Sequence, residues 1–337
     1  MRAPRSLTAT AAVAAALLAG GCGASGSDEP RAPQAASSAK LRAELNDATR
    51  SQAGDFPAAN GRSLQQVADA LDLSGPQVGL AGSVFTVGQN RLAFGVIDAK
   101  SGFIYGKTAV YVADSPGAKA RGPYAAPADL LVTDPAFRSR TAAAEDDIFA
   151  AIYETRVPLT KPGSASILVV TQIGDKLAGA PAQLNVMAVA KDDIPRPGEQ
   201  PPAITTDTVQ KASGDIASID TRLPPDDMHD TDFADVIGKQ PVALLFATPA
   251  LCESRVCGPV VDIAAQLKAS YGDRVQFIHQ EVFVANDPNK GLRKPLLDFH
   301  LKTEPWLFVF DRSGRVTARL EGSFGFDAFE RALKSAL

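Results

Sequence analysis

Residues 241–259 read PVALLFATPALCESRVCGP, and this stretch decides the fold of the second half of the chain. Its apolar run, Val242 to Ala247, has the length of one buried strand, and a proline ends it. Cys252 and Cys257 follow, directly before a helical pattern. Because the amide dipoles at the start of a helix stabilise a thiolate, we expect cysteines at this place to be chemically active.

Residues 226–337 alternate strand and helix around this stretch. The apolar spacing predicts, in order, a short helix Thr231–Ile237, a strand Val242–Ala247, a helix Val260–Tyr271, a strand Val275–Phe283, a helix Leu292–His300, strands Trp306–Asp311 and Val316–Leu320, and a helix Phe326–Leu337. Ser313-Gly314 marks a hairpin turn between the last two strands. This order predicts a single α/β layer structure whose sheet contains one antiparallel hairpin.

This region resembles the thioredoxin superfamily. Three features carry the resemblance: the strand–cysteine–helix unit at Val242–Tyr271, Glu304-Pro305 directly before a strand, and the hairpin Asp311-Arg312-Ser313-Gly314. The resemblance implies that Pro305 is cis, faces the reactive cysteine and positions a client chain. An exported lipoprotein with a β domain before such a domain is also similar to a group of actinobacterial thioredoxin-domain lipoproteins.

The cysteine motif departs from the C-x-x-C pattern of that family, because four residues separate Cys252 from Cys257. Either Cys252 is the attacking cysteine, or Cys257-Gly258-Pro259 matches the family's Cys-Gly-Pro; the first alignment is favoured because Cys252 lies nearer the strand end. In one regular helix the two residues would lie about 140° and ~8 Å apart. A disulfide needs Cα atoms within roughly 7 Å. We therefore expect Cys252 in the loop and Cys257 at the helix start.

The neighbouring side chains suggest how the thiols are tuned. Arg255 would lower a thiol pKa, whereas Glu253 would act in the opposite sense or accept a proton. Trp306 is expected either beside the cysteines or as an ordinary core aromatic. The strand Val242–Ala247 contains no acid, so the buried aspartate that helps many thioredoxins to move protons is missing.

Two other interpretations of the cysteine pair stay open. It is a structural disulfide in a non-catalytic binding or scaffold lipoprotein, or it binds copper, as in the similar Sco family with its C-x-x-x-C-P motif. In that family a histidine ligand falls where this chain has Glu304. His279 and His300 are each expected to be core or surface histidines rather than ligands. The sequence therefore predicts no cofactor, with copper as the less favoured alternative.

Residues 76–190 contain a series of short strand patterns separated by turn signals. The predicted strands are Gln77–Thr86, Arg91–Asp98, Ala109–Ala113, Val157–Leu159, Ala165–Ile173 and Ala182–Ala190. Residues 159–170 resemble a strand start of bacterial immunoglobulin-like domains, which implies an all-β sandwich acting as a spacer or protein-contact module. Residues 191–225, rich in proline, are expected to be an interdomain linker.

The N-terminus has the pattern of an export signal, residues 1–21, with two arginines before an apolar stretch. The stretch ends at Ala19-Gly20-Gly21-Cys22, which resembles the bacterial lipobox. Lipidation of Cys22 would anchor the protein to the outer face of the cell membrane. It would also leave Cys252 and Cys257 as the only pair among three cysteines. Residues 22–75 are expected to be a tether with short helices, of which 23–40 are disordered.

Together these patterns predict a multidomain protein, an immunoglobulin-like sandwich followed by an α/β thioredoxin-like domain in residues 226–337. We expect a membrane-anchored extracytoplasmic thiol–disulfide oxidoreductase that acts on exported proteins. Its catalytic residues would be Cys252, Cys257 and Pro305. The net charge of −4 and the lack of a basic stripe argue against a nucleic acid partner.

Overall fold

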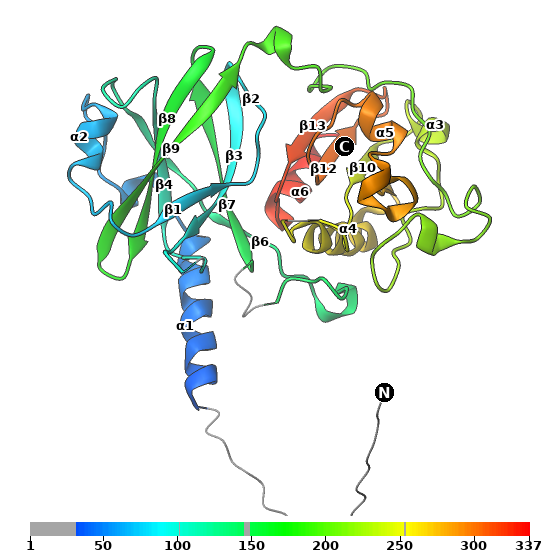
Figure 1. Cartoon of the computed structure of the whole chain (residues 1–337), viewed down its shortest axis with the longest axis horizontal. Coiled ribbons are helices and arrows are strands. Elements are labelled where there is room, and N and C mark those ends of the chain that lie inside the picture. Colours follow the sequence, from blue (N-terminus) through cyan, green and yellow to red (C-terminus); the bar gives the residue numbers. More distant parts are fainter. Residues whose placement is uncertain (1–31, 101, 145–148, 253) are drawn as a thin grey trace, which may run out of the picture.

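The computed structural model describes residues 32–337, apart from residues 101, 145–148 and 253. The predicted signal segment, residues 1–21, and the predicted lipidation site Cys22 lie outside the described residues. Figure 1 shows two units side by side, one made of two β-sheets and one made of a third sheet with helices around it. Within the described part of the chain, no helix is long and apolar enough to cross a membrane.

The first unit consists of two β-sheets. The four-stranded sheet has the order β1 (Gln77–Leu80), β3 (Gly88–Ile97), β7 (Ala151–Leu159), β6 (Ala128–Leu130). The five-stranded sheet has the order β2 (Phe85–Thr86), β9 (Lys176–Met187), β8 (Gly163–Ile173), β4 (Thr108–Ala113), β5 (Arg121–Ala125). Neighbouring strands are antiparallel except for the short parallel pair of β2 and β9.

The core of this unit lies between the two sheets. Phe94 and Tyr153 of one sheet stack on each other and face Val110 and Val112 of the other. Strand β4 is buried on both faces, because its alternate residues, such as Tyr111, pack under helix α2 (Leu64–Ala68). The two sheets therefore form a sandwich whose larger sheet is covered on its outer face as well.

Several boundaries in this unit differ from the sequence prediction. The single strand expected over Gln77–Thr86 is two strands, β1 and β2, which belong to different sheets. Strands β5 and β6 were not predicted because they are short and carry Pro123 and Asp129 in place of an apolar alternation. Residues 32–40 are not a disordered tether but part of helix α1 (Ala32–Ala48), as their high alanine content favours.

The second unit contains a four-stranded mixed sheet with the order β11 (Gln276–Gln280), β10 (Val242–Phe246), β12 (Trp306–Phe310), β13 (Val316–Glu321). Strands β10 and β11 are parallel and are joined by helix α4 (Cys257–Tyr271), whereas β12 and β13 are antiparallel to their neighbours. Every residue of β10 is buried, as its uninterrupted apolar run predicts. The chain as a whole is thus built mainly of β-sheets, with few helices.

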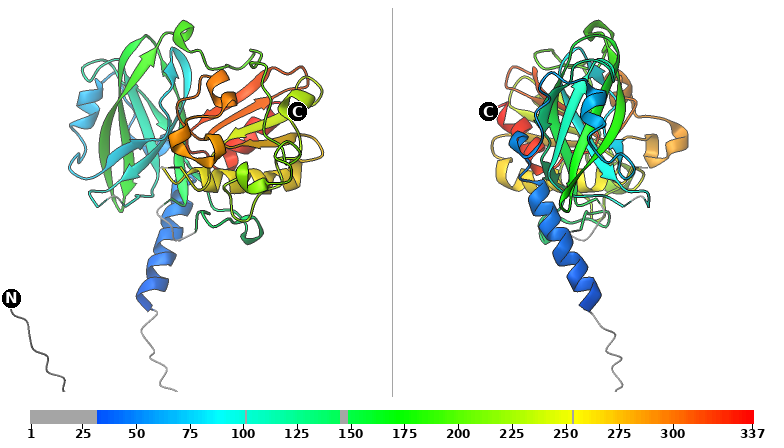
Figure 2. Two further views of the ribbon diagram at one scale, coloured as in Figure 1. Left: turned by 45° about the vertical axis from the view of Figure 1, so that its right-hand side comes forward. Right: turned by 90° about the vertical axis from the view of Figure 1, so that its left-hand side faces the viewer.

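Two layers cover this sheet. Leu245, Leu307 and Val309 pack on one face against α4 and α6 (Phe326–Lys334). The other face, which carries Trp306 and Phe308, packs against the short helices α3 (Phe233–Val236) and α5 (Lys294–Asp298). Figure 2 shows the helices on the two sides of the sheet in a second orientation. The end of β10, where the cysteines follow, is therefore held between two packed layers.

The proline-rich segment, residues 191–225, is not a free linker. Ile194 and Ile204 are buried in the second unit's core, and Arg319 of β13 donates a hydrogen bond to the carbonyl of Ile194. Arg293 pairs with Asp207 at 2.6 Å. Prolines stop this segment from joining a sheet, but they do not prevent its apolar residues from packing on one, which is why its composition was misleading.

Close polar contacts join the two units. Arg91 of β3 donates hydrogen bonds to the carbonyl oxygens of Glu321 and Ser323 at 2.9 and 2.7 Å. The carboxylate of Asp129 accepts hydrogen bonds from three backbone N–H groups at the start of α6, including that of Gly325. A side chain at Gly322 would place its Cβ 1.4 Å from the carbonyl oxygen of Ala81, so only glycine allows this approach. The sandwich is thus docked on the end of the third sheet.

Candidate active site

The two cysteines lie where the spacing of the motif predicts. Cys252 belongs to the segment of residues 248–256, here called the cysteine loop, and its backbone N–H donates to the carbonyl of Thr248 at 3.1 Å. Cys257 is the first residue of α4. Both cysteines are free thiols in this structure. The loop places Cys252 at the amino end of the helix, so that the two thiols face each other.

The two thiols differ strongly in exposure and in acidity. A hydrogen bond from the Cys257 thiol lowers the pKa of Cys252 to about 6, and Ser254, 3.2 Å away, and the backbone N–H groups of Val256 and Cys257 act in the same sense against the effect of burial. Cys257 is completely buried, and burial together with the nearby Cys252 sulfur raises its pKa well above the ordinary value. Cys252, by contrast, is partly exposed. The geometry therefore creates one accessible thiolate and one protected thiol.

The expected role of Arg255 differs from what the structure shows. Its guanidinium lies over the ring of Phe149, 5.6 Å from the centroid, and the main influences that lower the pKa of Cys252 are hydrogen bonds. Arg255 has φ = 60°, a left-handed conformation that turns its side chain toward the sandwich. Glu253 lies outside the described residues.

Pro305 directly precedes β12, and the peptide bond between Glu304 and Pro305 is cis, as the resemblance implies. Its carbonyl accepts a hydrogen bond from the Gly322 N–H at 2.8 Å. Glu304 is close enough to Cys257 for its charge to raise the pKa of that thiol. The segment before β12 therefore lies beside the cysteine pair.

Trp306 does not pack beside the cysteines. It is 1% exposed, stacks on Phe308, and donates a hydrogen bond to the hydroxyl of Thr303 at 3.0 Å. Because side chains alternate along β12, Trp306 points to the face of the sheet opposite the one that packs against Cys257. It is a core aromatic.

A cavity of about 360 Å³ lies between the two units and borders the cysteine loop. Its lining is mainly apolar and includes Val256, Glu304, Phe103, Phe149 and Leu131. Thr141 packs closely against the first turn of α4. A Cβ at Gly258, the residue after Cys257, would lie 2.3 Å from the Thr141 hydroxyl oxygen. The sandwich therefore covers one side of the cysteine site and leaves an apolar cavity next to it.

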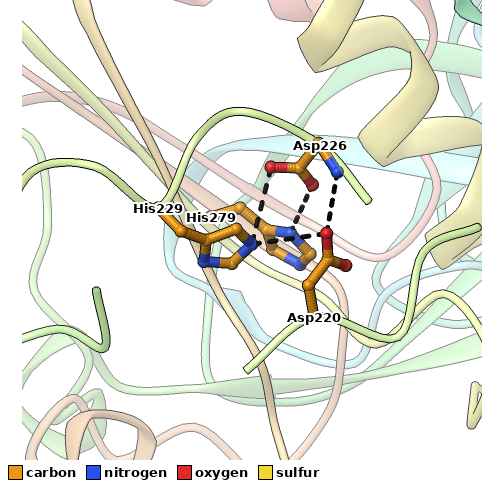
Figure 3. Close-up of side chains that lie close together, drawn as sticks. All are labelled: Asp220, Asp226, His229 and His279. Atoms are coloured by element: carbon orange, nitrogen blue, oxygen red, sulfur yellow. Dashed lines mark hydrogen bonds and ion pairs between the residues drawn. The ribbon is translucent and has the colours of Figure 1, made fainter. Parts of the chain in front are cut away.

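A second group of chemically active side chains lies behind the cysteine loop. Asp220, Asp226, His229 and His279, here called the histidine–aspartate cluster, place their ligand atoms within 4.8 Å of one another (Figure 3). His279 was predicted as a core or surface histidine. Asp220 falls in the predicted linker, and Asp226 and His229 fall in the predicted domain 226–337 without having been singled out. The one available sequence signal was the spacing Asp226-x-x-His229, which is too common to identify a site.

Hydrogen bonds hold His279 at the centre of this cluster. Its Nδ1 lies 2.8 Å from the Asp226 carboxylate and its Nε2 lies 3.1 Å from the carbonyl oxygen of Ala247, the last residue before the cysteine loop. Burial opposes a charge on His279, but the Asp226 carboxylate outweighs it and raises the pKa of the imidazole to about 10. Without a cation, His279 is therefore an imidazolium that donates to both acceptors.

Among the described residues, the cluster of potential metal ligands contains neither cysteine. His300 is exposed in the turn that follows α5. The copper alternative required a histidine next to the thiols, and the residue before Pro305 is Glu304.

Comparisons with known proteins give little further information. No family model matches the chain, and no curated protein matches it significantly. One similar solved structure is a Chlorobium tepidum protein that carries the name thiol:disulfide interchange protein DsbE, with a TM-score of 0.31, 17% identity, and coverage of 42% of this chain and 98% of that one. A second is an endo-β-1,4-mannanase from Thermotoga petrophila, with a TM-score of 0.19, 11% identity, and coverage of 37% of this chain and 22% of that one. A third is the PKD domain of human SorCS2, with a TM-score of 0.19, 15% identity, and coverage of 35% of this chain and 77% of that one. At TM-scores below 0.5, these likenesses assign neither a fold nor a function.

Proposed function

We propose that this protein is a thiol–disulfide oxidoreductase with a thioredoxin-like unit in residues 226–337. The support comes from its own geometry: a mixed sheet of order β11-β10-β12-β13, a cysteine pair at the start of α4, and Pro305 beside that pair. The immunoglobulin-like character of the sandwich belongs to the same proposal.

The asymmetry between the two thiols carries this proposal. An exchange reaction needs one thiolate that a client can reach and a second thiol that is kept from competing until a mixed disulfide has formed. Cys252 is partly exposed and has a pKa of about 6, whereas Cys257 is buried with a raised pKa. An inert disulfide would need neither property.

The reaction is written here in the reducing direction. The Cys252 thiolate attacks one sulfur of a client disulfide, a Cys252–client disulfide forms, and the other client sulfur leaves as a thiolate that takes up a proton. Cys257 then loses its proton and attacks the Cys252 sulfur, which releases the second client sulfur as a thiol. Two electrons pass to the client, and Cys252 and Cys257 end as a disulfide that an external dithiol must reduce. The oxidising direction is the reverse sequence.

The sandwich restricts which clients can reach Cys252. The cavity beside the cysteine loop is mainly apolar, and Phe149 and the residues around Thr141 cover neighbouring parts of the site. We infer that an extended client segment, with an apolar side chain near its cysteine, fits this space better than a folded surface. Exported proteins with unfinished disulfides present such segments, and lipidation at Cys22 would hold the enzyme at the membrane face where they emerge.

The test is disulfide reduction by the full-length protein in detergent, with dithiothreitol as the external dithiol and insulin as the substrate. We expect Cys252→Ser to abolish reduction. Cys257→Ser is expected to stop turnover and to accumulate mixed disulfides, because the resolving thiol is missing. Cys22→Ser is the matched control, because it removes a cysteine that is not part of the pair. This variant should reduce insulin at the normal rate, but in cells it should no longer be found in the membrane fraction.

The non-catalytic alternative makes the opposite prediction. If the pair were a structural disulfide, insulin reduction would match the dithiothreitol background and Cys257→Ser would trap no client. Its reduction potential would then lie below the glutathione range, near that of structural disulfides. Either result from the wild-type protein would overturn the proposal.

A further inference from the structure

The histidine–aspartate cluster is a closed pocket of metal-binding atoms. Asp220, Asp226 and His229 come from the segment before α3, and His279 comes from β11. Their side chains are 0–1% exposed. Figure 3 shows both carboxylates and the His229 ring converging on the same small region beside His279. Two imidazole nitrogens and two carboxylate oxygens form a ligand set that suits a divalent cation.

His229 is not explained by the interactions of the protein alone. Both of its ring nitrogens are buried without a hydrogen-bond partner. The Nε2 atom faces Asp226 and Asp220, but the carboxylate oxygens lie 3.5 and 3.7 Å away, too far for hydrogen bonds. Neighbouring ligands of a tetrahedral zinc ion, with bonds of roughly 2.0–2.1 Å, lie about 3.3 Å apart. The spacing around His229 therefore matches the edges of a coordination polyhedron.

A second layer of hydrogen bonds orients these ligands. Asp220 accepts from the backbone N–H of Arg222 at 2.7 Å and from that of Asp226 at 2.8 Å. The other carboxylate, that of Asp226, accepts from the Met228 N–H at 2.8 Å. When Nδ1 of His279 binds a cation, its Nε2–H still donates to the carbonyl of Ala247. Such outer contacts, from a backbone carbonyl to a histidine and from N–H groups to carboxylates, are typical of protein metal sites.

Charge leads to the same conclusion. The His279 imidazolium compensates one of the two buried carboxylates, that of Asp226, and leaves one negative charge in the cluster. A charge without a partner in the interior is costly. A divalent cation bound by two carboxylates and two neutral imidazoles gives a neutral site, and it satisfies the orphaned nitrogen of His229 as well. The absence of thiolate among the four ligands favours Zn²⁺ over Cu⁺.

We propose that Asp220, Asp226, His229 and His279 bind one Zn²⁺ ion in a closed, four-ligand structural site. The ion would fasten the segment before α3 to β11. Thr221, next to Asp220, accepts a hydrogen bond from the N–H of Ala250 in the cysteine loop at 3.1 Å. An ion that fixes Asp220 would therefore also help to hold the cysteine loop in place. The proposal is independent of thiol exchange, because neither cysteine is a ligand.

The experiment is metal binding by the full-length protein, unfolded with a chelator, dialysed, and refolded with or without one equivalent of Zn²⁺ or Co²⁺. Refolding is needed because the site is closed. We expect one ion per chain, a higher melting temperature with Zn²⁺, and visible absorption bands of tetrahedral Co²⁺ without a thiolate charge-transfer band. The Cys252→Ser/Cys257→Ser double variant should bind equally well, and so should His300→Gln, the control for an exposed histidine.

His229→Gln should weaken Zn²⁺ binding by about 100-fold or more, because it removes a ligand. Asp220→Asn is the second variant, in case His229→Gln does not refold, and it should weaken binding in the same way. The proposal is overturned if refolded wild-type protein takes up no ion. Unchanged affinity in both ligand variants, or lost binding in the double cysteine variant, would overturn it equally, because the ion would then lie elsewhere.

Discussion

The cysteine loop and the histidine–aspartate cluster meet at the end of β10, yet they have opposite environments. Ala247, the residue directly after β10, accepts a hydrogen bond from His279 of the cluster. Cys252 lies only a few residues farther on and is partly exposed. The loop holds one partly exposed sulfur, that of Cys252, whose pKa is lowered, whereas the side chains of the cluster are all buried. An exposed sulfur suits the proposed exchange reaction, and a buried ligand set suits the proposed permanently bound ion.

The largest expected difference between the two regions is in stability. Asp226→Ala leaves His279 buried without its carboxylate partner and should lower the free energy of unfolding by about 3–5 kcal/mol. Asp227→Ala is the matched control, because that side chain is 73% exposed and its ion pair with Lys268 should contribute at most about 1 kcal/mol. Urea denaturation of the reduced protein measures both. Equal losses of unfolding free energy in the two variants would show that the buried Asp226–His279 pair stabilises the protein no more than an exposed ion pair does.

The next difference concerns thiol reactivity against pH. Because the folded-state pKa of Cys252 is lowered to about 6, its thiolate is present above that pH, and its alkylation rate should rise through pH 6 and then level off. Cys257, with its raised pKa and full burial, should react only in strongly alkaline solution or after unfolding. Iodoacetamide labelling followed by mass spectrometry separates the two sites. A midpoint for Cys252 at the ordinary thiol pKa would contradict the hydrogen-bonded arrangement.

A smaller effect should appear where the two regions touch. The Thr221 hydroxyl donates to the buried Glu281 carboxylate at 2.6 Å and accepts from the Ala250 N–H. Thr221→Val removes both bonds and should cost about 1–3 kcal/mol, with faster hydrogen exchange at Ala250. Thr160→Val, at an exposed hydrogen bond in the sandwich, is the control. Unchanged exchange at Ala250 would mean that Thr221 does not support the loop.

The smallest effect is expected for Arg255→Ala. The guanidinium of Arg255 lies over Phe149, and the main influences that lower the pKa of Cys252 are hydrogen bonds. The pH midpoint of Cys252 alkylation should therefore stay close to 6, whereas Ser254→Ala, which removes one of those hydrogen bonds, should move it upward. A clear upward shift in Arg255→Ala would restore the direct electrostatic role that the sequence suggests.

Local patterns predicted the core elements well where periodicity was strong. The apolar run at Val242–Ala247 is β10 within one residue, and the helical pattern that follows the cysteines is α4. Placing Cys257 at the helix start needed only the geometry of an α-helix. Strand β5, by contrast, has no apolar alternation, and it pairs only because β4 supplies a partner.

Composition was misleading in the two segments that pack in unexpected ways. Residues 32–40 looked like a tether but continue into a helix whose end, around Leu45, docks on the sandwich. The proline-rich residues 191–225 pack along the third sheet. For residues 191–225, the deciding interactions are with residues far away in the chain, and no local signal reports them. For residues 32–40, the alanine content was the local signal that favoured the helix.

By itself, the sequence determined the buried strand, the cysteine spacing and the position of both thiols relative to α4, because these follow from residue type and helical geometry over a few residues. Tertiary structure alone decided which sulfur is exposed, that Arg255 turns to Phe149, and that Trp306 faces away from Cys257. It also brought His279 within reach of Asp226, across 53 positions of sequence. Burial and pKa depend on what the rest of the chain packs around a group, and that is a property of the whole fold.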